Sequence, residues 1–206
     1  MQNHPLRILI AEDEAMILFG FKSFLNKMGH QVIGEAYDGE TAVNLSRTLS
    51  PDLIIMDVKM PNMDGIKALE IINDGTTIIT PCIFVTAYSD DYLIEKAKNA
   101  GAFNYLIKPI SFESLRAAID IAFIRFNEYK ELHNELIITK NNLQDRKIIE
   151  KAKGLLMDEF CFKEQQAMDY LQKKSRNTNK KLIEIAKDLI RMNETLGTQF
   201  NSTNRK

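Results

Sequence analysis

The sequence predicts an α/β fold of the doubly wound type for its first 111 residues, followed by an all-helical region. Two observations lead to this prediction. Short apolar runs alternate with helical patterns as far as residue 111, and such alternation is typical of parallel strands joined by right-handed helical crossovers. From residue 112 to residue 150 the chain contains neither Gly nor Pro, which indicates one long helix.

Five short runs rich in Ile, Leu and Val are bounded by turn residues, as expected for buried parallel strands. The runs are Arg7–Ala11, Gln31–Ala36, Leu53–Met56, Cys82–Thr86 and Phe103–Ile107. Four helical patterns lie between them, and a fifth begins after Pro109. The four are Ala15–Met28, Glu40–Thr48, Gly65–Asn73 and Tyr92–Asn99. We therefore expect a doubly wound, five-stranded parallel sheet with helices on both faces.

Apolar residues in the long helix recur from Leu115 in alternating steps of four and three, the heptad pattern of a two-stranded coiled coil. The predicted dimer seam, within residues 115–143, consists of Ile119, Ala122, Phe126, Tyr129, His133, Leu136, Lys140 and Leu143. Its two polar members cost stability but can fix the register. The alternative is a single amphipathic helix lying on its own domain. Because the heptad pattern is longer than the predicted sheet could cover, we expect that a partner chain covers the rest.

The last third of the chain predicts a small three-helix bundle. The long helix is expected to end near Glu159, and Lys163–Lys174 and Lys180–Glu194 follow as amphipathic segments. Residues 197–206 are polar and are expected to form a flexible tail. Gly154 lies inside the long helix, where Gly costs about 1 kcal/mol relative to Ala. We therefore expect another helix or a ligand to approach closely there.

Composition excludes several classes of protein. The 206 residues are 45% hydrophobic and 27% charged, a balance that argues against disorder throughout. No apolar run approaches 18 residues and the start lacks a signal-peptide pattern, so we expect a cytoplasmic protein without a membrane partner. Cys82 and Cys161 form neither a disulfide framework nor a zinc ligand set.

Charge divides the chain into two parts. Residues 1–140 contain 13 basic and 19 acidic residues, whereas residues 141–206 contain 14 basic and 9 acidic residues. An acidic first part and a basic second part suggest two roles, and the second part could face a polyanion. An ordinary solvated helical surface is the alternative for the basic part.

Charged and hydroxyl side chains follow the strands at the edge where a doubly wound sheet binds ligands. In strand order they are Glu12, Asp13 and Glu14, then Asp57, Thr86 and Lys108. Neighbouring carboxylates repel one another, so the group requires a cation or raised pKa values. Mg²⁺ suits carboxylate ligands and bridges them to phosphate, while a Lys ammonium can pair with a phosphoryl oxygen. The set predicts a phosphoryl-transfer site with a carboxylate nucleophile.

The stretches ILIAEDE, LIIMDVKMPNMDG, FVTAYSD and YLIKP resemble the receiver domain of two-component response regulators, over residues 5–125. The resemblance implies a flavodoxin-like fold in which Asp57 accepts a phosphoryl group from a cognate sensor histidine kinase. It implies that Lys108 stabilises the acyl phosphate. The implied Mg²⁺ ligands are Glu12, Asp13, Asp57 and the backbone carbonyl of Lys59. Many members of the family have Asp where this chain has Glu12.

The same resemblance implies a conformational response to phosphorylation. Thr86 would swing toward the phosphoryl oxygens, and Tyr105 would move inward with it. The peptide bond between Lys108 and Pro109 is expected to be cis, as in the family. The chain is not expected to be an enzyme in the usual sense.

The segment DRKIIEKAKGLLM, together with Ala167, Leu171 and LIEIAKDLI, resembles the ANTAR domain, a three-helix RNA-binding module of transcription antiterminators. The resemblance covers residues 143–196. Its core residues would be Ala152, Lys153, Gly154, Leu156, Met157, Ala167, Leu171 and Ala186. Two departures are Cys161, near a turn where the family commonly has Gly, and Ser175–Arg176 in place of a more usual Ala-Met pair.

Basic side chains of this region are the predicted RNA contacts, because Lys and Arg neutralise phosphates and Arg can stack on unpaired bases. They are Arg146, Lys147, Lys151, Lys153, Lys173, Lys174, Arg176, Lys180 and Lys181. The alternative is a solvated helix face followed by a flexible basic loop.

Together these expectations describe a response regulator whose phosphorylation controls homodimerisation. The dimer would place two RNA-binding bundles on tandem stem-loops of an mRNA leader and so promote antitermination. A DNA-binding helix-turn-helix is one alternative, and it is disfavoured because Lys180–Glu194 is mostly Leu, Ile and acidic residues. A phosphorylation-switched docking scaffold that binds no nucleic acid is the other alternative.

Overall fold

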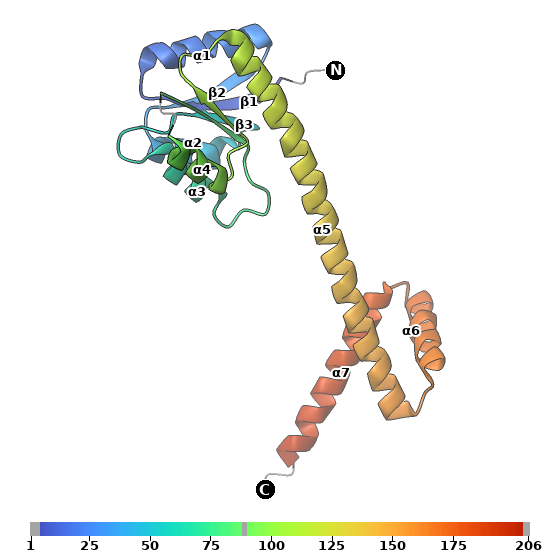
Figure 1. Ribbon diagram of the computed structural model, residues 1–206. Helices are drawn as coiled ribbons and strands as arrows, with labels where there is room; N and C mark the ends of the chain where they lie inside the picture. Colours follow the sequence, from blue (N-terminus) through green and yellow to red (C-terminus); the bar gives the residue numbers. More distant parts are fainter. Residues whose placement is uncertain (1–4, 88–89, 204–206) are drawn as a thin grey trace. The chain divides into compact units, whose positions relative to one another are not determined.

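The computed structural model describes residues 5–87 and 90–203, with side chains described as far as residue 194. The chain divides into two compact units, residues 1–133 and residues 134–206. The first unit is a sheet flanked by helices, and the second consists of helices (Figure 1). Within the described residues, no helix is both long enough and apolar enough to span a membrane.

Five parallel strands form the sheet of the first unit, as predicted. They are β1 (Arg7–Ala11), β2 (Gln31–Ala36), β3 (Leu53–Met56), β4 (Cys82–Thr86) and β5 (Asn104–Ile107). The strand order is β2-β1-β3-β4-β5, and every neighbouring pair is parallel. The three central strands are buried, which explains why they are continuous apolar runs in the sequence.

Four helices connect the strands, close to the predicted positions. They are α1 (Ala15–Met28), α2 (Gly39–Leu49), α3 (Gly65–Asn73) and α4 (Asp91–Asn99). Three begin at an Asp whose carboxylate accepts a backbone N–H of the first turn; these are Asp38, Asp64 and Asp90. The first helix ends at Gly29, which adopts a left-handed φ of 83°.

The pleat of β1 distributes its side chains to two separate cores. Ile8 and Ile10 join a core with α1 and the start of α5 (Phe112–Phe160), whereas Leu9 and Ala11 join a core with α2, α3 and α4. The sheet therefore has helices on both faces (Figure 1).

The first part of the predicted dimer seam lies inside the first unit. Ile119 and Ala122 are buried in the core beneath the sheet, so they cannot face a second chain, and the prediction is wrong for these two residues. The cause is that an apolar stripe at heptad spacing also suits a helix packed on its own sheet. Phe126 and Tyr129 lie edge-on to the Phe103 ring, at centroid distances of 5.9 and 6.2 Å.

The later part of the seam faces solvent. The side chains of Leu136 and Leu143 are each 56% exposed, and Lys140 is exposed as well. His133 stacks on the Tyr129 ring at 5.8 Å. The seam from Phe126 onward stays a prediction, because a single chain contains no partner helix.

Three helices form the second unit: the last part of α5, α6 (Glu164–Thr178) and α7 (Leu182–Thr203). Their shared core consists of Ala152, Leu156, Ala167, Leu171, Ile185 and Ala186. Met157 is exposed and does not belong to this core. A Cβ added at Gly154 would meet no described atom within 4 Å, so no described helix approaches closely there, and the approach of a ligand stays a prediction.

The last helix is longer than predicted. It continues to Thr203, so a helix occupies most of the segment expected to be a tail from residue 197. No Pro occurs in this segment to stop the helix. Residues 204–206 of the expected tail lie outside the described residues.

Candidate functional site

Three charged side chains meet at the carboxyl edge of the sheet. Lys108 Nζ lies 2.6 Å from Asp57 Oδ2 and 2.8 Å from Glu12 Oε2, and it also donates a hydrogen bond to Glu12 Oε1 at 3.0 Å. The ladder between strands fixes these positions. The backbone N–H of Asp57 donates to the carbonyl of Ala11, and that of Lys108 donates to the carbonyl of Thr86. The predicted nucleophile and the predicted lysine are therefore in direct contact.

Burial makes these charges strongly interdependent. Glu12 is fully buried, and the side chains of Asp57 and Lys108 are 8% and 13% exposed. Burial raises the pKa of Glu12, although Lys108 opposes the change. Burial alone would lower the pKa of Lys108, but Asp57 and Glu12 together outweigh that effect and raise it. The ammonium is thus stabilised by the carboxylates that it neutralises.

The carboxylates of Glu12, Asp13 and Asp57 fit a hard divalent cation. One oxygen from each lies within 4.8 Å of the others. Octahedral Mg²⁺ binds oxygen at about 2.1 Å, so ligands on opposite sides are about 4.2 Å apart, and small side-chain movements would suffice. Glu12 Oε2 contacts Lys108 without hydrogen-bond geometry and so keeps a lone pair available. Asp13 is exposed, which leaves room for the waters that Mg²⁺ retains.

The remaining predicted residues surround this edge. The Lys59 N–H donates to Asp57 Oδ1 at 3.2 Å, while a metal-binding role for its carbonyl stays a prediction. Thr86 is fully buried at the end of β4. Tyr105, on the neighbouring strand, contacts the Phe84 ring at 6.5 Å, and burial, reinforced by Asp57 and Asp90, raises the pKa of its hydroxyl. The Lys108–Pro109 bond is cis, as expected from the family.

Gly65 also belongs to the site, although no role was predicted for it from the sequence. Its N–H donates to the Val58 carbonyl at 2.9 Å, and a Cβ added here would collide with the Asp57 carbonyl oxygen. The glycine thus lets α3 begin directly against the backbone of the predicted nucleophile. The quoted stretch LIIMDVKMPNMDG ends on this glycine, so the signal was present in the sequence.

Most of the predicted RNA contacts are exposed on the second unit. Lys153 is the exception: it is buried, and its ammonium lies 2.7 Å from Glu164 and 3.1 Å from Glu150. Hydrogen bonds to these two carboxylates raise its pKa. The prediction of an exposed RNA contact is therefore wrong for Lys153, because its charge joins α5 to α6. The other eight predicted contacts are exposed, and they extend from Arg146 to Lys181.

An acidic pocket with a central aspartate and a facing lysine, at the carboxyl edge of a five-stranded parallel sheet, defines the receiver class of signalling domain. The family model for the response regulator receiver domain matches residues 8–120. The ANTAR domain model matches residues 139–190. The chain belongs to the response regulators that join a receiver domain to an ANTAR domain, a family of transcription regulators.

Two curated relatives match most of the chain. The transcriptional regulatory protein PdtaR of Mycobacterium tuberculosis is 40% identical over 194 residues, which cover 94% of this chain and 92% of that protein. The transcriptional regulatory protein YdfI of Bacillus subtilis is 32% identical, over 76% of this chain and 79% of that protein.

Solved structures resemble the first unit. The signal receiver domain of a modulated diguanylate cyclase from Desulfovibrio desulfuricans G20 matches with a TM-score of 0.56 and 27% identity, over 61% of this chain and 99% of that chain. A Borrelia burgdorferi complex of CheX, CheY, BeF3 and magnesium matches with a TM-score of 0.56 and 25% identity, over 58% of this chain and 90% of that chain. Receiver domains bind Mg²⁺ at an acidic pocket of this kind.

Proposed function

We propose that Asp57 receives a phosphoryl group from the phosphohistidine of a sensor histidine kinase. The supporting observation is the contact of Lys108 with both Asp57 and Glu12. A carboxylate oxygen of Asp57 forms the new P–O bond while the P–N bond of the phosphohistidine breaks, and the leaving imidazole takes up a proton. Lys108 can turn from the carboxylates to a phosphoryl oxygen. Mg²⁺, held by Glu12, Asp13, Asp57 and the Lys59 carbonyl, would neutralise charge on the phosphoryl group.

Phosphorylation then favours a homodimer. The acyl phosphate adds charge and acceptor oxygens beside Thr86, and repacking of Thr86 and Tyr105 changes the face around α4 and α5. The dimer forms through the seam from Phe126 to Leu143, in which Leu136, Lys140 and Leu143 are exposed. The exposed leucines in this segment support the proposal, since water contact with large apolar side chains is unfavourable.

The second unit binds RNA. Its exposed basic side chains can neutralise phosphates, and a dimer presents two such units to tandem stem-loops of an mRNA leader. The second stem-loop is then captured at a high effective concentration, so modest affinity per unit suffices. Capture prevents a terminator hairpin from forming, in the cytoplasm where the transcript is made.

Labelling of the full chain by a small phosphodonor with Mg²⁺ tests the first step. Asp57→Asn should abolish labelling, because an amide cannot form the acyl phosphate. Asp52→Asn is the matched control, since this carboxylate caps the Arg7 N–H and lies outside the pocket. Retained labelling of Asp57→Asn would contradict the receiver assignment.

Binding of phosphorylated chain to RNA hairpins and to matching duplex DNA, at two salt concentrations, tests the last step. Charge reversal at Lys173 should weaken RNA binding. It should also lower the slope of the logarithm of the binding constant against the logarithm of the salt concentration by about one. Lys98→Glu, on α4 of the first unit, is the control. Preferential binding to DNA would favour the helix-turn-helix alternative, and binding to neither would favour a docking scaffold.

A further inference from the structure

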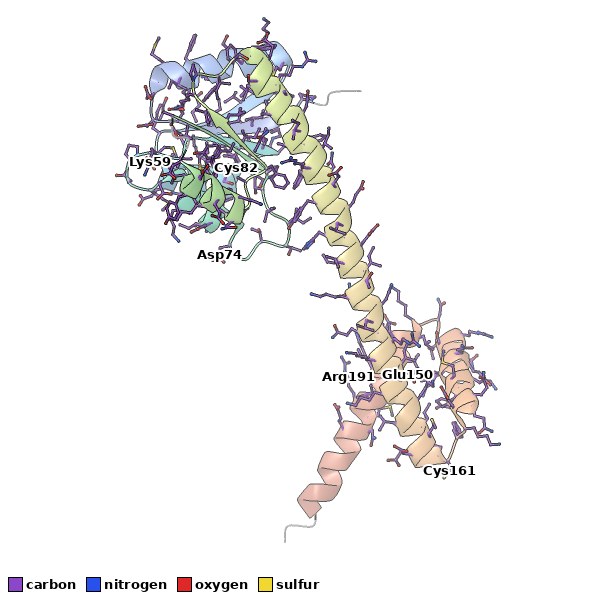
Figure 2. All side chains as sticks on the ribbon, in the orientation of Figure 1. Lys59, Asp74, Cys82, Glu150, Cys161 and Arg191 are labelled. Atoms are coloured by element: carbon purple, nitrogen blue, oxygen red, sulfur yellow. The ribbon has the colours of Figure 1, made fainter. Side chains whose placement is uncertain are left out.

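Three aromatic rings lie together where α5 ends and α6 begins, close to the Cys161 labelled in Figure 2. Phe160 contacts Phe162 at a centroid distance of 5.8 Å, and Phe162 contacts Tyr170 at 6.0 Å. Phe162 also packs against the core of the second unit. By contrast, the side chains of Phe160 and Tyr170 are 62% and 39% exposed. A half-buried ring thus lies in contact with two exposed rings.

Positive charge borders this aromatic cluster. The Lys174 ammonium lies 5.6 Å from the centre of the Tyr170 ring and 3.5 Å from its hydroxyl. One turn away on the same face, the side chains are those of Gln166 and Lys173, neither of them acidic. Asp169 is turned about 100° around the helix and accepts a hydrogen bond from Gln165.

We propose that Phe160 and Tyr170 form a platform on which an unpaired RNA base stacks, with Lys173 and Lys174 beside the adjoining phosphates. The inference rests on the proposed RNA-binding function and specifies what the second unit recognises. An aromatic face binds any exposed base but cannot reach bases inside a duplex, so the platform selects the loop of a stem-loop rather than its stem. The basic neighbours favour a polyanion over a second copy of this chain.

The test uses the full chain, phosphorylated with a small phosphodonor. The probes are an RNA hairpin pool with a randomised loop and the blunt RNA duplex of the same stem. Phe160→Leu and Tyr170→Leu keep an apolar side chain but remove the aromatic face. Each should weaken hairpin binding about 5- to 150-fold, the range for a lost base–aromatic contact. Duplex binding and the salt slope should be unchanged, because no charge is altered.

Tyr170→Phe is the matched control, since it keeps the ring, and it should bind hairpins like the unaltered chain. Melting temperatures of both Leu variants should fall only slightly, because each variant loses one ring contact with Phe162 and the altered side chains are largely exposed. Unaltered hairpin affinity in both Leu variants, together with a loss for Lys173→Glu, would overturn the platform and leave RNA binding intact. A Leu variant that instead changes the sedimentation of RNA-free chain would assign the rings to a protein interface. Failure of the unaltered chain to bind either RNA would overturn the platform and the proposed function together.

Discussion

Replacing Lys108 by Met should destabilise the first unit, because it leaves two buried carboxylates without their cation. Breaking a buried ion pair by removing one partner costs about 3–5 kcal/mol. Asp57 and Lys108 are 8% and 13% exposed, so some solvent reaches the pair, and we expect the lower end of that range. With a urea dependence of about 2 kcal/mol/M for a unit of this size, the unfolding midpoint should fall by about 1.5 M.

The stability that the first unit loses in the Lys108→Met variant should depend on pH and on Mg²⁺. Loss of Lys108 removes the contact that lowers the pKa of Glu12, so burial raises that pKa further. The carboxyl of Glu12 then binds its proton more tightly in the folded unit than in the unfolded chain, where its pKa is 4.5. The resulting contribution to the free energy of unfolding is fully present below pH 4.5 and is lost as the pH rises through the folded-state pKa. The deficit should therefore be smaller at pH 5 than at pH 8. Mg²⁺ at 100 times its dissociation constant should restore about 2.7 kcal/mol.

Hydrogen exchange of the β3 and β4 amides as a function of urea reports on the first unit alone, because both strands lie in its core. Lys67→Met is the matched control, because the ion pair of Lys67 with Glu70 is more than half exposed. Its loss should change the free energy of unfolding by less than about 1 kcal/mol. An unchanged midpoint for Lys108→Met, or no greater stabilisation of the variant than of the unaltered chain at the same Mg²⁺ concentration, would refute this account of the pocket.

Three further predictions concern the glycines, the buried lysine and the seam. Gly65→Ala should destabilise the first unit by about 1–3 kcal/mol in thermal melts, because its methyl group collides with the Asp57 carbonyl, whereas Gly154→Ala should stabilise α5 by up to about 1 kcal/mol. Stabilisation by both would contradict the packing. Lys153→Met should lower the melting temperature of the second unit, since two carboxylates lose their shared cation; equal melting would remove its bridging role. Leu136→Glu should shift the phosphorylated chain toward monomers in sedimentation, whereas Ile138→Glu, off the heptad positions, should leave the dimer intact.

The sheet and its acidic edge could be predicted from the sequence because each signal is local. A run such as Leu53–Met56 has no polar side chain to place in water, so burial on both faces is the consistent interpretation. Parallel strands end at one edge, so residues that follow them meet there. This brings Asp57 and Lys108 into contact although they are 51 residues apart in the chain.

Two of the predictions that failed did so because they depend on tertiary contacts. The heptad stripe of α5 does not specify what covers it, and the sheet already covers Ile119 and Ala122. Lys153 looks like its exposed basic neighbours in sequence, and its i,i+3 spacing from Glu150 was a weak indication of pairing. The second partner, Glu164, comes from the next helix, and no local pattern indicates that contact.

The corner between α5 and α6 carries a further consequence. Cys161 adopts a left-handed φ of 55°, a conformation that costs a residue with a Cβ about 1–2 kcal/mol and costs glycine almost nothing. A relative with glycine at this position would fold through the same corner with less strain. Valine or isoleucine, whose branched Cβ crowds the backbone further, would force the corner to open. The residue that a homologous chain has at this position therefore indicates whether that chain keeps the hairpin formed by α5 and α6.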